Sequence, residues 1–290
     1  MVKIIRMNTI NYTLIDTDEG IIEFRKYLYY ENITKIAMDF EGEFNLHSYG
    51  EKLCLIQIFD GLKYYLIDPF LISKEEIIKF FEYKHAIKIM YGVESDVSLV
   101  YSQYGVLIKN IFDLKIIVDI LQLESKGLDT VLKHFMNIEI KDKHKYQYLD
   151  WTKRPLKKDA IQYALNDVAH LLKLNEILIE HIKINDKYED LIYRLVKKDY
   201  YPKKNRIPAI FKKIEFKNLS NEDKEIFKKI HQIREFYSKE YDIPPFKFID
   251  NNVLFDILYK KRNIDEINLN KIVPIKIQTE IIEKIKNVLL

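Results

Sequence analysis

Three apolar runs, residues 34–41, 53–60 and 63–68, have the composition of β-strands, being rich in Ile, Leu and Tyr. Asp60-Gly61 separates the last two runs, and this dipeptide is a strong hairpin signal. We therefore expect an antiparallel meander of three strands. The apolar spacing then becomes that of a helix, beginning at residues 74–84. This order predicts a mixed sheet with helices, an α/β domain.

Further elements follow in the same alternating manner. A strand is expected at 86–92, and then a helix that ends at Gly105, a residue suited to the left-handed position after a helix. Later helices are expected at 115–122, 127–136, 156–182 and 186–198, with a polar loop at 140–155. The C-terminal part looks helical throughout, at 220–240, 250–261, 264–269 and 275–289.

The length of 290 residues favours two domains over one. We expect an α/β domain over 1–198 and a small all-α domain over 214–290. The segment 199–213 contains two prolines and little periodicity, which indicates a linker.

The net charge of +3 is unevenly distributed, because residues 1–200 carry −3 (28 basic, 31 acidic) and 201–290 carry +6 (19 basic, 13 acidic). A basic accessory region would suit nucleic acid, but Lys, Ile, Asn and Tyr are abundant everywhere, which weakens that reading. Cys54 is the single cysteine, so the chain can build neither an internal disulfide nor a thiolate metal site. No apolar run approaches the ~18–20 residues of a membrane span, and the start lacks a signal-peptide pattern. We expect a cytoplasmic protein that does not enter membranes.

One predicted strand contains two carboxylates, Asp39 and Glu41, inside the apolar run Ile36–Phe44. Alternation places both on one face, roughly 7 Å apart at ~3.3 Å per residue, with the apolar residues on the other face. Burying either anion unpaired costs several kcal/mol, and the run contains no Lys or Arg. A divalent cation such as Mg²⁺ or Mn²⁺ would compensate, since such ions prefer oxygen ligands. The alternative is a strand whose second face is solvated.

Two further stretches carry similar residues. Asp96 begins a predicted helix directly after a strand, and Tyr163 and Asp167 lie four apart on an otherwise apolar helical face. Taken singly, Asp96 could be an ordinary N-terminal helix charge and Tyr163 a core aromatic.

Together the pattern Asp39-x-Glu41, Asp96 and Tyr163-x-x-x-Asp167 resembles the three motifs of the DEDDy family of 3′–5′ exonucleases, most closely ribonuclease D. The segments "YGEKLCLIQIF", "YYLIDPF" and "DWTKRPLKKDAIQYALNDVAHLL" extend the resemblance over about residues 34–180. It implies a ribonuclease H-like α/β fold. Two positions depart from the family pattern: Tyr91, where His is frequent, and Phe40, where ribonuclease D often has Thr.

The second domain also has a likeness. Residues 223–258 are similar to the HRDC domain that RecQ helicases and ribonuclease D share. The sequence "NKIVP" replaces the usual Gly-containing turn before the last helix, which weakens the expectation of a nucleic-acid contact there.

The resemblance implies that Asp39, Glu41, Asp96 and Asp167 hold two divalent cations, Mg²⁺ or Mn²⁺, ~3.5–4 Å apart. Tyr163 would orient the attacking water, and nucleoside 5′-monophosphates would leave from the 3′ end. We expect RNA 3′ ends as substrate, as in maturation of tRNA or other structured RNA. Alternatives are DNA 3′ ends, very short RNA, or a non-catalytic RNA-binding protein. Without a Gly-rich phosphate loop, no nucleotide cofactor is expected.

Other residues could assist. Asp113 matches a family position and is expected to be a supporting or structural residue. Trp151 and Arg154 could hold the 140–155 loop over the substrate, although a lone Trp is as often a packing anchor. Aromatic and basic residues alternate in a pattern suited to base stacking and phosphate contact, with a solvated linker as the alternative: Tyr200, Tyr201, Lys203, Lys204 and Arg206.

Overall fold

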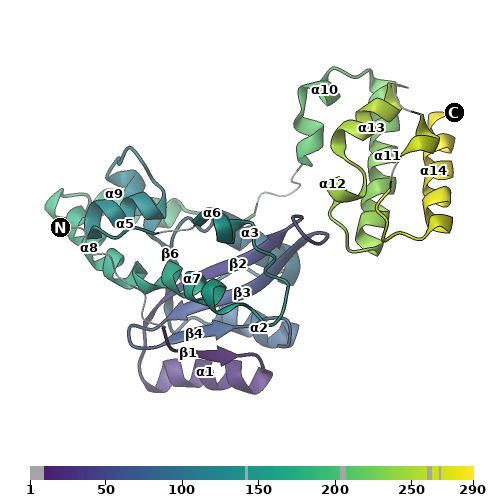
Figure 1. Ribbon diagram of the computed structural model, residues 1–290. Helices are drawn as coiled ribbons and strands as arrows, with labels where there is room; N and C mark the ends of the chain where they lie inside the picture. Colours follow the sequence, from purple (N-terminus) through teal and green to yellow (C-terminus); the bar gives the residue numbers. More distant parts are fainter. Residues whose placement is uncertain (1–9, 141–142, 203–206, 260–262, 268) are drawn as a thin grey trace. The chain divides into compact units, whose positions relative to one another are not determined.

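Six strands form one mixed sheet in the order β1-β4-β3-β2-β5-β6 (Figure 1). Their bounds are Tyr12–Ile15 (β1), Lys35–Phe44 (β2), Glu51–Phe59 (β3), Tyr64–Ile67 (β4), Ile87–Met90 (β5) and Ile111–Asp113 (β6). β3 pairs antiparallel with β4, whereas β1 with β4, β2 with β5, and β5 with β6 pair parallel. Only residues 45–50 join the neighbouring strands β2 and β3, too few for a parallel crossover, so these two form a hairpin. The predicted meander is confirmed.

The computed structural model describes residues 10–140, 143–202, 207–259, 263–267 and 269–290. Nine helices are described up to residue 202: Asp18–Tyr30 (α1), Lys74–Glu82 (α2), Glu94–Tyr104 (α3), Leu114–Ile120 (α4), Leu128–Met136 (α5), Lys143–Gln147 (α6), Lys158–Ala169 (α7), Leu171–Ile184 (α8) and Tyr188–Lys197 (α9). Gly105 ends α3 with φ of +73°, as its position predicted. Strand β1 and helix α1 had not been predicted.

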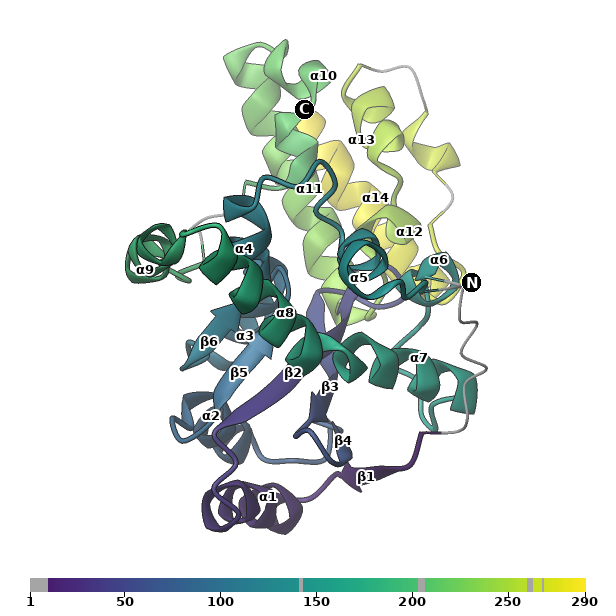
Figure 2. The ribbon, with the colours of Figure 1, turned by 90° about the vertical axis from the view of Figure 1, so that its left-hand side faces the viewer.

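Apolar side chains cover both faces of the sheet. On one face Ile36, Met38 and Phe40 of β2 join a core with side chains of α1, α2 and α3. On the other face α7 packs against β3, and α4 and α8 pack beside β5. Figure 2 shows α7 and α8 crossing that second face. Because β2 alternates, Asp39 and Glu41 point toward the face that α7 and α8 cover.

The long helix predicted over 156–182 is interrupted at His170, where φ is −109° and ψ is −8°. The interruption lets α7 and α8 pack on different parts of the sheet. Ala160 and Ala164 of α7 join a cluster with β3 and β4, while Leu174 and Leu178 of α8 join a cluster with α4 and β5. This division depends on tertiary packing, because no Pro or Gly marks the interruption in the sequence.

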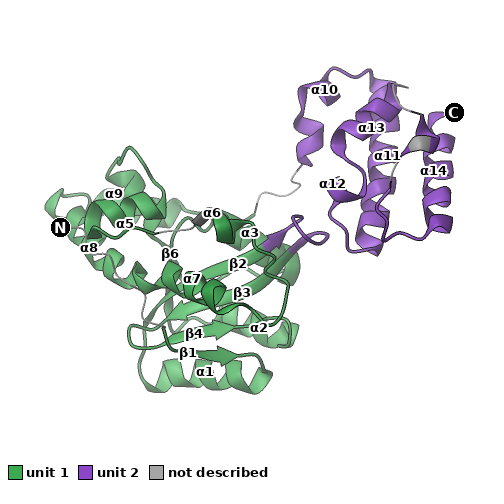
Figure 3. Ribbon diagram, in the orientation of Figure 1, with its two compact units in different colours: residues 1–42, 52–202 green, residues 43–51, 203–290 purple. Residues whose placement is uncertain are grey.

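The chain divides into two compact units, residues 1–42 with 52–202 and residues 43–51 with 203–290 (Figure 3). The described elements after residue 202 are all helical: Ala209–Lys212 (η1), Ile214–Lys217 (α10), Asn221–Glu240 (α11), Pro245–Phe248 (α12), Asn251–Leu258 (α13), Ile264–Glu266 (η2) and Ile275–Leu289 (α14). Phe227, Ile230 and Leu254 are buried at the centre of this unit. None of the helices that the structure describes is both long and apolar enough to cross a bilayer.

Residues 209–213 differ from the expected linker. Ala209–Lys212 forms a short 3₁₀ helix, and its Ile210 is buried in the core of the second unit. The apolar pair Ile210-Phe211 therefore acts as an anchor of the helical unit, and the part left to connect the units is shorter than predicted.

Candidate active site

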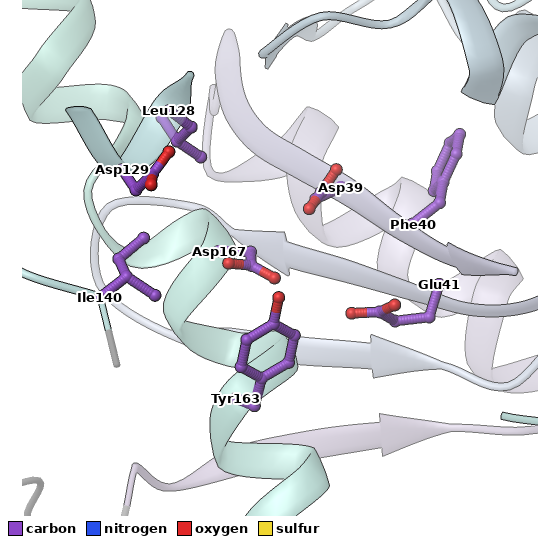
Figure 4. Close-up of a pocket in the computed structure, with 8 residues that line it drawn as sticks. All are labelled: Asp39, Phe40, Glu41, Leu128, Asp129, Ile140, Tyr163 and Asp167. Carbon is purple, nitrogen blue, oxygen red and sulfur yellow. The ribbon is translucent and has the colours of Figure 1, made fainter. Parts of the chain in front are cut away.

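The carboxylates of β2 open into a cavity of about 200 Å³ beneath α7 (Figure 4). The residues that line it come from β2, α5, α7 and the loop after α5: Asp39, Phe40, Glu41, Leu128, Asp129, Ile140, Tyr163 and Asp167. Four of the five residues predicted as the reactive site therefore share one cavity. The strand alternation and the four-residue helical spacing account for their common direction.

Tyr163 and Asp167 form a connected pair on α7. The Tyr163 hydroxyl is hydrogen-bonded to the Asp167 carboxylate, and both groups point into the space beside Asp39 and Glu41 in Figure 4. The Tyr163 ring stacks on Tyr146, with 4.4 Å between ring centroids and 22° between planes. Stacking on one side and the hydrogen bond at the tip hold the hydroxyl in one place.

Asp96 lies in the first turn of α3 and is not among the cavity-lining residues, yet its charge acts on Glu41. The turn before α3 is held by Asp113, whose Oδ1 accepts from the Gly92 amide at 2.7 Å and from the Lys115 amide at 3.0 Å. Asp113 therefore caps the N-terminus of α4 and also holds the turn that precedes α3. This is a supporting role, as the sequence led us to expect.

Burial disfavours ionisation of Asp39, Glu41 and Asp96, and repulsion between carboxylates adds to it at Glu41 and Asp96. Burial raises the pKa of Asp39 to about 7, although the Phe40 amide partly opposes the shift. Burial, and then the charges of Asp167, Asp39 and Asp96, raise the pKa of Glu41 well above its ordinary value. The pKa of Asp96 is also raised by burial, and by Asp39 and Asp113. Four full negative charges are thus unfavourable here unless positive charge enters.

The donor set fits hard divalent cations. It consists of carboxylate oxygens from β2, α3 and α7, which are the ligands that Mg²⁺ and Mn²⁺ prefer, and a cation would relieve the repulsion. As the side chains stand in the described parts of the chain, no group of three or more His, Cys, Asp or Glu surrounds a point closely enough to hold an ion. The chemistry of the site, rather than a finished coordination shell, supports metal binding.

Trp151 and Arg154 pack the 140–155 loop against the sheet. The Trp151 side chain is 2% exposed, and its Nε1 donates to the Tyr146 carbonyl at 3.2 Å. Arg154 binds the carboxylate of Asp68 and donates from Nη2 to the Cys54 carbonyl at 2.6 Å. The structure therefore makes Trp151 a packing anchor in place of the proposed nucleic-acid contact. Arg154 is largely committed to protein partners.

Tyr200 is one of the aromatic residues in the segment that was predicted to stack on bases and contact phosphates. Its ring packs against the core of the first unit. Lys198 Nζ lies 5.4 Å from the centre of that ring and 3.0 Å from Glu94 Oε1. Tyr200 is therefore tied to the protein, whereas Tyr201 is 65% exposed. Lys203, Lys204 and Arg206 lie outside the described residues.

Three cavity residues, Leu128, Asp129 and Ile140, were missed from the sequence. Asp129 occupies the first turn of α5, where an acidic residue is common for electrostatic reasons, so nothing marked it out. Its Oδ1 lies only 2.7 Å from where a Cβ on Gly127 would be, so a larger residue at 127 would displace that carboxylate. The sequence offered no signal that this helix start faces Asp39.

Glu43 shows that strand alternation alone does not make a site. It is the third acidic residue at alternate positions of β2, and it is 1% exposed. Its Oε1 accepts from the amides of Leu46 and His47, the latter at 2.9 Å. Glu43 therefore closes the turn after β2, and backbone donors compensate its burial.

Comparison with known proteins agrees with this geometry. A family model described as 3′–5′ exonuclease matches residues 12–183. Ribonuclease D of Haemophilus influenzae is 33% identical over 147 residues, covering 50% of this chain and 36% of that protein. Exosome complex component 10 homolog of Caenorhabditis elegans is 29% identical over 209 residues, covering 68% of this chain and 23% of that protein. The chain thus spans well under half the length of these curated relatives.

Solved structures show the same fold. The catalytic core of RRP6 from Trypanosoma brucei has a TM-score of 0.78 and 22% identity, covering 97% of this chain and 79% of that one. RNase D of Escherichia coli has a TM-score of 0.69 and 17% identity, covering 96% and 75%. The match to the family model extends over more than half of the 290 residues and includes every residue of the acidic cavity. The chain therefore belongs to the 3′–5′ exonuclease family and is ribonuclease D-like.

Proposed function

We propose that this protein is a metal-dependent 3′–5′ exoribonuclease of the DEDDy type, which releases nucleoside 5′-monophosphates from RNA 3′ ends. The observation that carries the proposal is the cavity in which Asp39, Glu41 and Asp167 face the hydroxyl of Tyr163. RNA is favoured as substrate by the relatives, since the E. coli protein of the same fold is described as an exoribonuclease involved in structured RNA processing. Maturation of tRNA or another structured RNA is the corresponding role.

Asp39, Glu41, Asp96 and Asp167 would hold two divalent cations, Mg²⁺ or Mn²⁺. When bound, such ions lower the pKa of the attacking water and stabilise the leaving 3′ oxygen. The carboxylates contribute negative charge that the cations would neutralise. Asp113, through Gly92, keeps Asp96 near the other three.

Tyr163 would orient the attacking water without removing its proton. Burial and the neighbouring carboxylates raise the pKa of Tyr163 above its ordinary value, so the phenol stays protonated at neutral pH. Its hydroxyl is already fixed by Asp167 and by stacking on Tyr146. A fixed hydroxyl can hold the water in line with the scissile phosphate.

The wall formed by Leu128, Asp129 and Ile140 suits the terminal nucleoside. Leu128 and Ile140 offer apolar contact to a base, whereas Asp129 offers an acceptor to a ribose hydroxyl. Asp129 would repel a phosphate, so the phosphate is proposed to lie on the other side of the cavity, beside the cations that Asp39 and Glu41 would hold. In this proposal the base and the sugar lie at α5 and the reacting bond lies at β2.

The helical region 214–290 is proposed to be an HRDC-like domain that helps hold folded RNA. Its formal charge is only +1, from 14 basic and 13 acidic residues, whereas 201–213 carries five basic and no acidic residues. Long-range attraction of RNA is therefore assigned to residues 201–213 and not to the region 214–290. We place the enzyme in the cytoplasm.

The test uses matched RNA and DNA oligonucleotides, 5′-labelled, long and very short, with Mg²⁺, Mn²⁺ or EDTA. We expect ladders that shorten from the 3′ end of RNA and stop in EDTA. Faster shortening of DNA or of very short RNA would select one of the two alternative substrates. Binding without any cleavage, with either cation, would instead indicate the non-catalytic RNA-binding protein.

A further inference from the structure

Helix α9 presents a contiguous apolar face to solvent. It is attached to the first unit through Leu191 and Leu195, which join the core beside α4 and α8. Figure 2 shows α9 at the margin of that unit. The helix also exposes large apolar side chains, up to 81% of the side chain at the last of them: Tyr188, Ile192, Tyr193 and Val196. A surface helix normally carries polar residues on the sides that leave the core, so a face of this kind indicates an interaction site.

The exposed face consists of two rows of side chains, each with a spacing of four residues. Their members are all exposed: Tyr188, Ile192 and Val196 in the first row, and Glu189, Tyr193 and Lys197 in the second. Residues four apart lie above one another on one side of a helix. Each member of the second row directly follows a member of the first in the sequence, so the two rows run side by side along α9.

The second row has opposite charges at its two ends. Glu189 lies in the first turn of α9 and Lys197 in the last turn. Eight residues separate them, which is about 12 Å at ~1.5 Å per residue, too far for an ion pair within one helix. The row therefore reads as an anion, an aromatic ring and a cation, in that order.

A second α9 that runs antiparallel to the first matches this order. A twofold axis between the two helices, at the level of Ile192, reverses the direction of the second helix and sets each row against itself. Glu189 of one copy then faces Lys197 of the partner subunit, and symmetry creates this pair twice. The apolar row meets the apolar row between them. A parallel pairing would instead place like charges at the same level.

We propose that α9 is the interaction surface for a second copy of this chain, which packs its own α9 antiparallel across a twofold axis. The order of charges is complementary to itself, and this favours a second copy over an unrelated protein. Ten residues of helix span only about 15 Å, so the contact is smaller than the ~1,200 Å² or more of stable complexes, and we expect a weak dimer. No residue of α9 lines the acidic cavity, so the inference does not depend on the proposed reaction.

The test measures association of the full chain by sedimentation equilibrium over a series of protein concentrations. Glu189→Lys and Lys197→Glu each turn two symmetry-related attractions into repulsions, and each should raise the dissociation constant about 10-fold or more. An equimolar mixture of these two variants should associate as tightly as the unaltered chain, because every facing pair in the mixed dimer again joins opposite charges. Ile192→Gln, which removes the apolar centre of the contact, should weaken association without any change of charge.

Arg194→Glu is the matched control. Arg194 is exposed two residues beyond Ile192, on the opposite side of α9, and its replacement changes the charge of the chain as much as Lys197→Glu does. The control variant should keep the dissociation constant of the unaltered chain. Mixed with Glu189→Lys, it should not restore tight association, and this separates facing pairs from general attraction between oppositely charged variants. Because all the substituted positions are exposed, the circular dichroism spectra should stay the same.

Three results would overturn the inference. The first is a chain that stays monomeric at every concentration, which would leave the face of α9 to a different protein or to another part of the chain. The second is a dimer whose dissociation constant is the same in Glu189→Lys and Lys197→Glu as in the unaltered chain, since the contact would then lie elsewhere. The third is a mixture of these two variants that associates no better than either variant alone.

Discussion

The hydroxyl of Tyr163 is hydrogen-bonded to the carboxylate of Asp167, one turn further along α7. This contact joins the only phenol of the cavity to one of its acidic groups, within the lining residues that the structure describes. Burial, and then the Asp167 charge, raise the pKa of Tyr163, so the site favours a protonated phenol. The two residues therefore divide their roles, with the carboxylate available to a cation and the hydroxyl available to water.

Tyr163→Phe should lower turnover by roughly 10²-fold, as is typical for one positioned polar group, while cation affinity stays unchanged. The phenyl ring can still stack on Tyr146, so the cavity should keep its shape. Single-turnover rates at saturating Mn²⁺ and Mn²⁺ affinity are the measurements. Tyr146→Phe, which keeps the stacked ring, is the control and should retain activity. A fall in Mn²⁺ affinity in Tyr163→Phe would make Tyr163 a structural support.

Asp39→Asn should abolish hydrolysis without unfolding the protein. Burial raises the pKa of Asp39, so its charge costs folding free energy when no cation is present. The variant should then unfold in EDTA at the same or a higher urea concentration than the wild type. Asp119→Asn, which removes a partly exposed charge paired with Lys126, is the control. Loss of a metal ligand should leave very little activity. The assignment would therefore be contradicted if the variant kept more than about a tenth of the wild-type rate at saturating Mg²⁺.

Asp129→Asn should raise KM for RNA by about 10-fold, the value of one hydrogen bond to a charged acceptor, with little change in cation affinity. The measurement compares RNA with an oligonucleotide whose terminal nucleotide lacks its 2′-hydroxyl. If Asp129 accepts from that hydroxyl, the variant and the wild type should differ less on the modified end. If KM rose equally for the RNA and for the oligonucleotide without the terminal 2′-hydroxyl, Asp129 would not contact that hydroxyl.

The salt dependence of RNA binding should come from the connecting segment. Replacing Lys203, Lys204 and Arg206 by Gln should reduce the slope of log affinity against log salt by up to about 2, at ~0.7 for each phosphate contact on a single strand. The matched control replaces Lys224, Lys228 and Lys229 of α11, which should change the slope little. A larger loss in the control would place the cationic contact on the helical domain.

His231 should make the second unit less stable in acid. Burial, and then the Arg234 charge, lower the pKa of His231 to about 4, although Glu235 Oε1 lies 3.4 Å from its Nε2. Between pH 6.5 and 4 the unfolded chain therefore binds a proton that the folded chain does not. Stability should fall as pH falls through this window, by up to about 3 kcal/mol. Urea midpoints from pH 7.5 to 4.5 should show a shallower decline in His231→Gln, and equal slopes would contradict this account.

Short-range spacing in the sequence determined which residues could act together within one element. Alternation along β2 set Asp39 and Glu41 on one face, and the helical repeat set Tyr163 and Asp167 on another. The end of α3 at Gly105 could be predicted equally well, because glycine adopts a positive φ more readily than other residue types. These relationships depend on backbone geometry over two to four residues, so they can be predicted from the spacing of residues in the sequence.

Contacts between distant segments were decided only in the tertiary structure. The sequence could not show that Asp129 and Ile140 enter the cavity of Asp39. It also left Trp151 evenly divided between packing and nucleic-acid contact, until its burial against α6 and α7 decided for packing. In each case the local pattern fits several environments. Which one is adopted depends on the elements that pack against it.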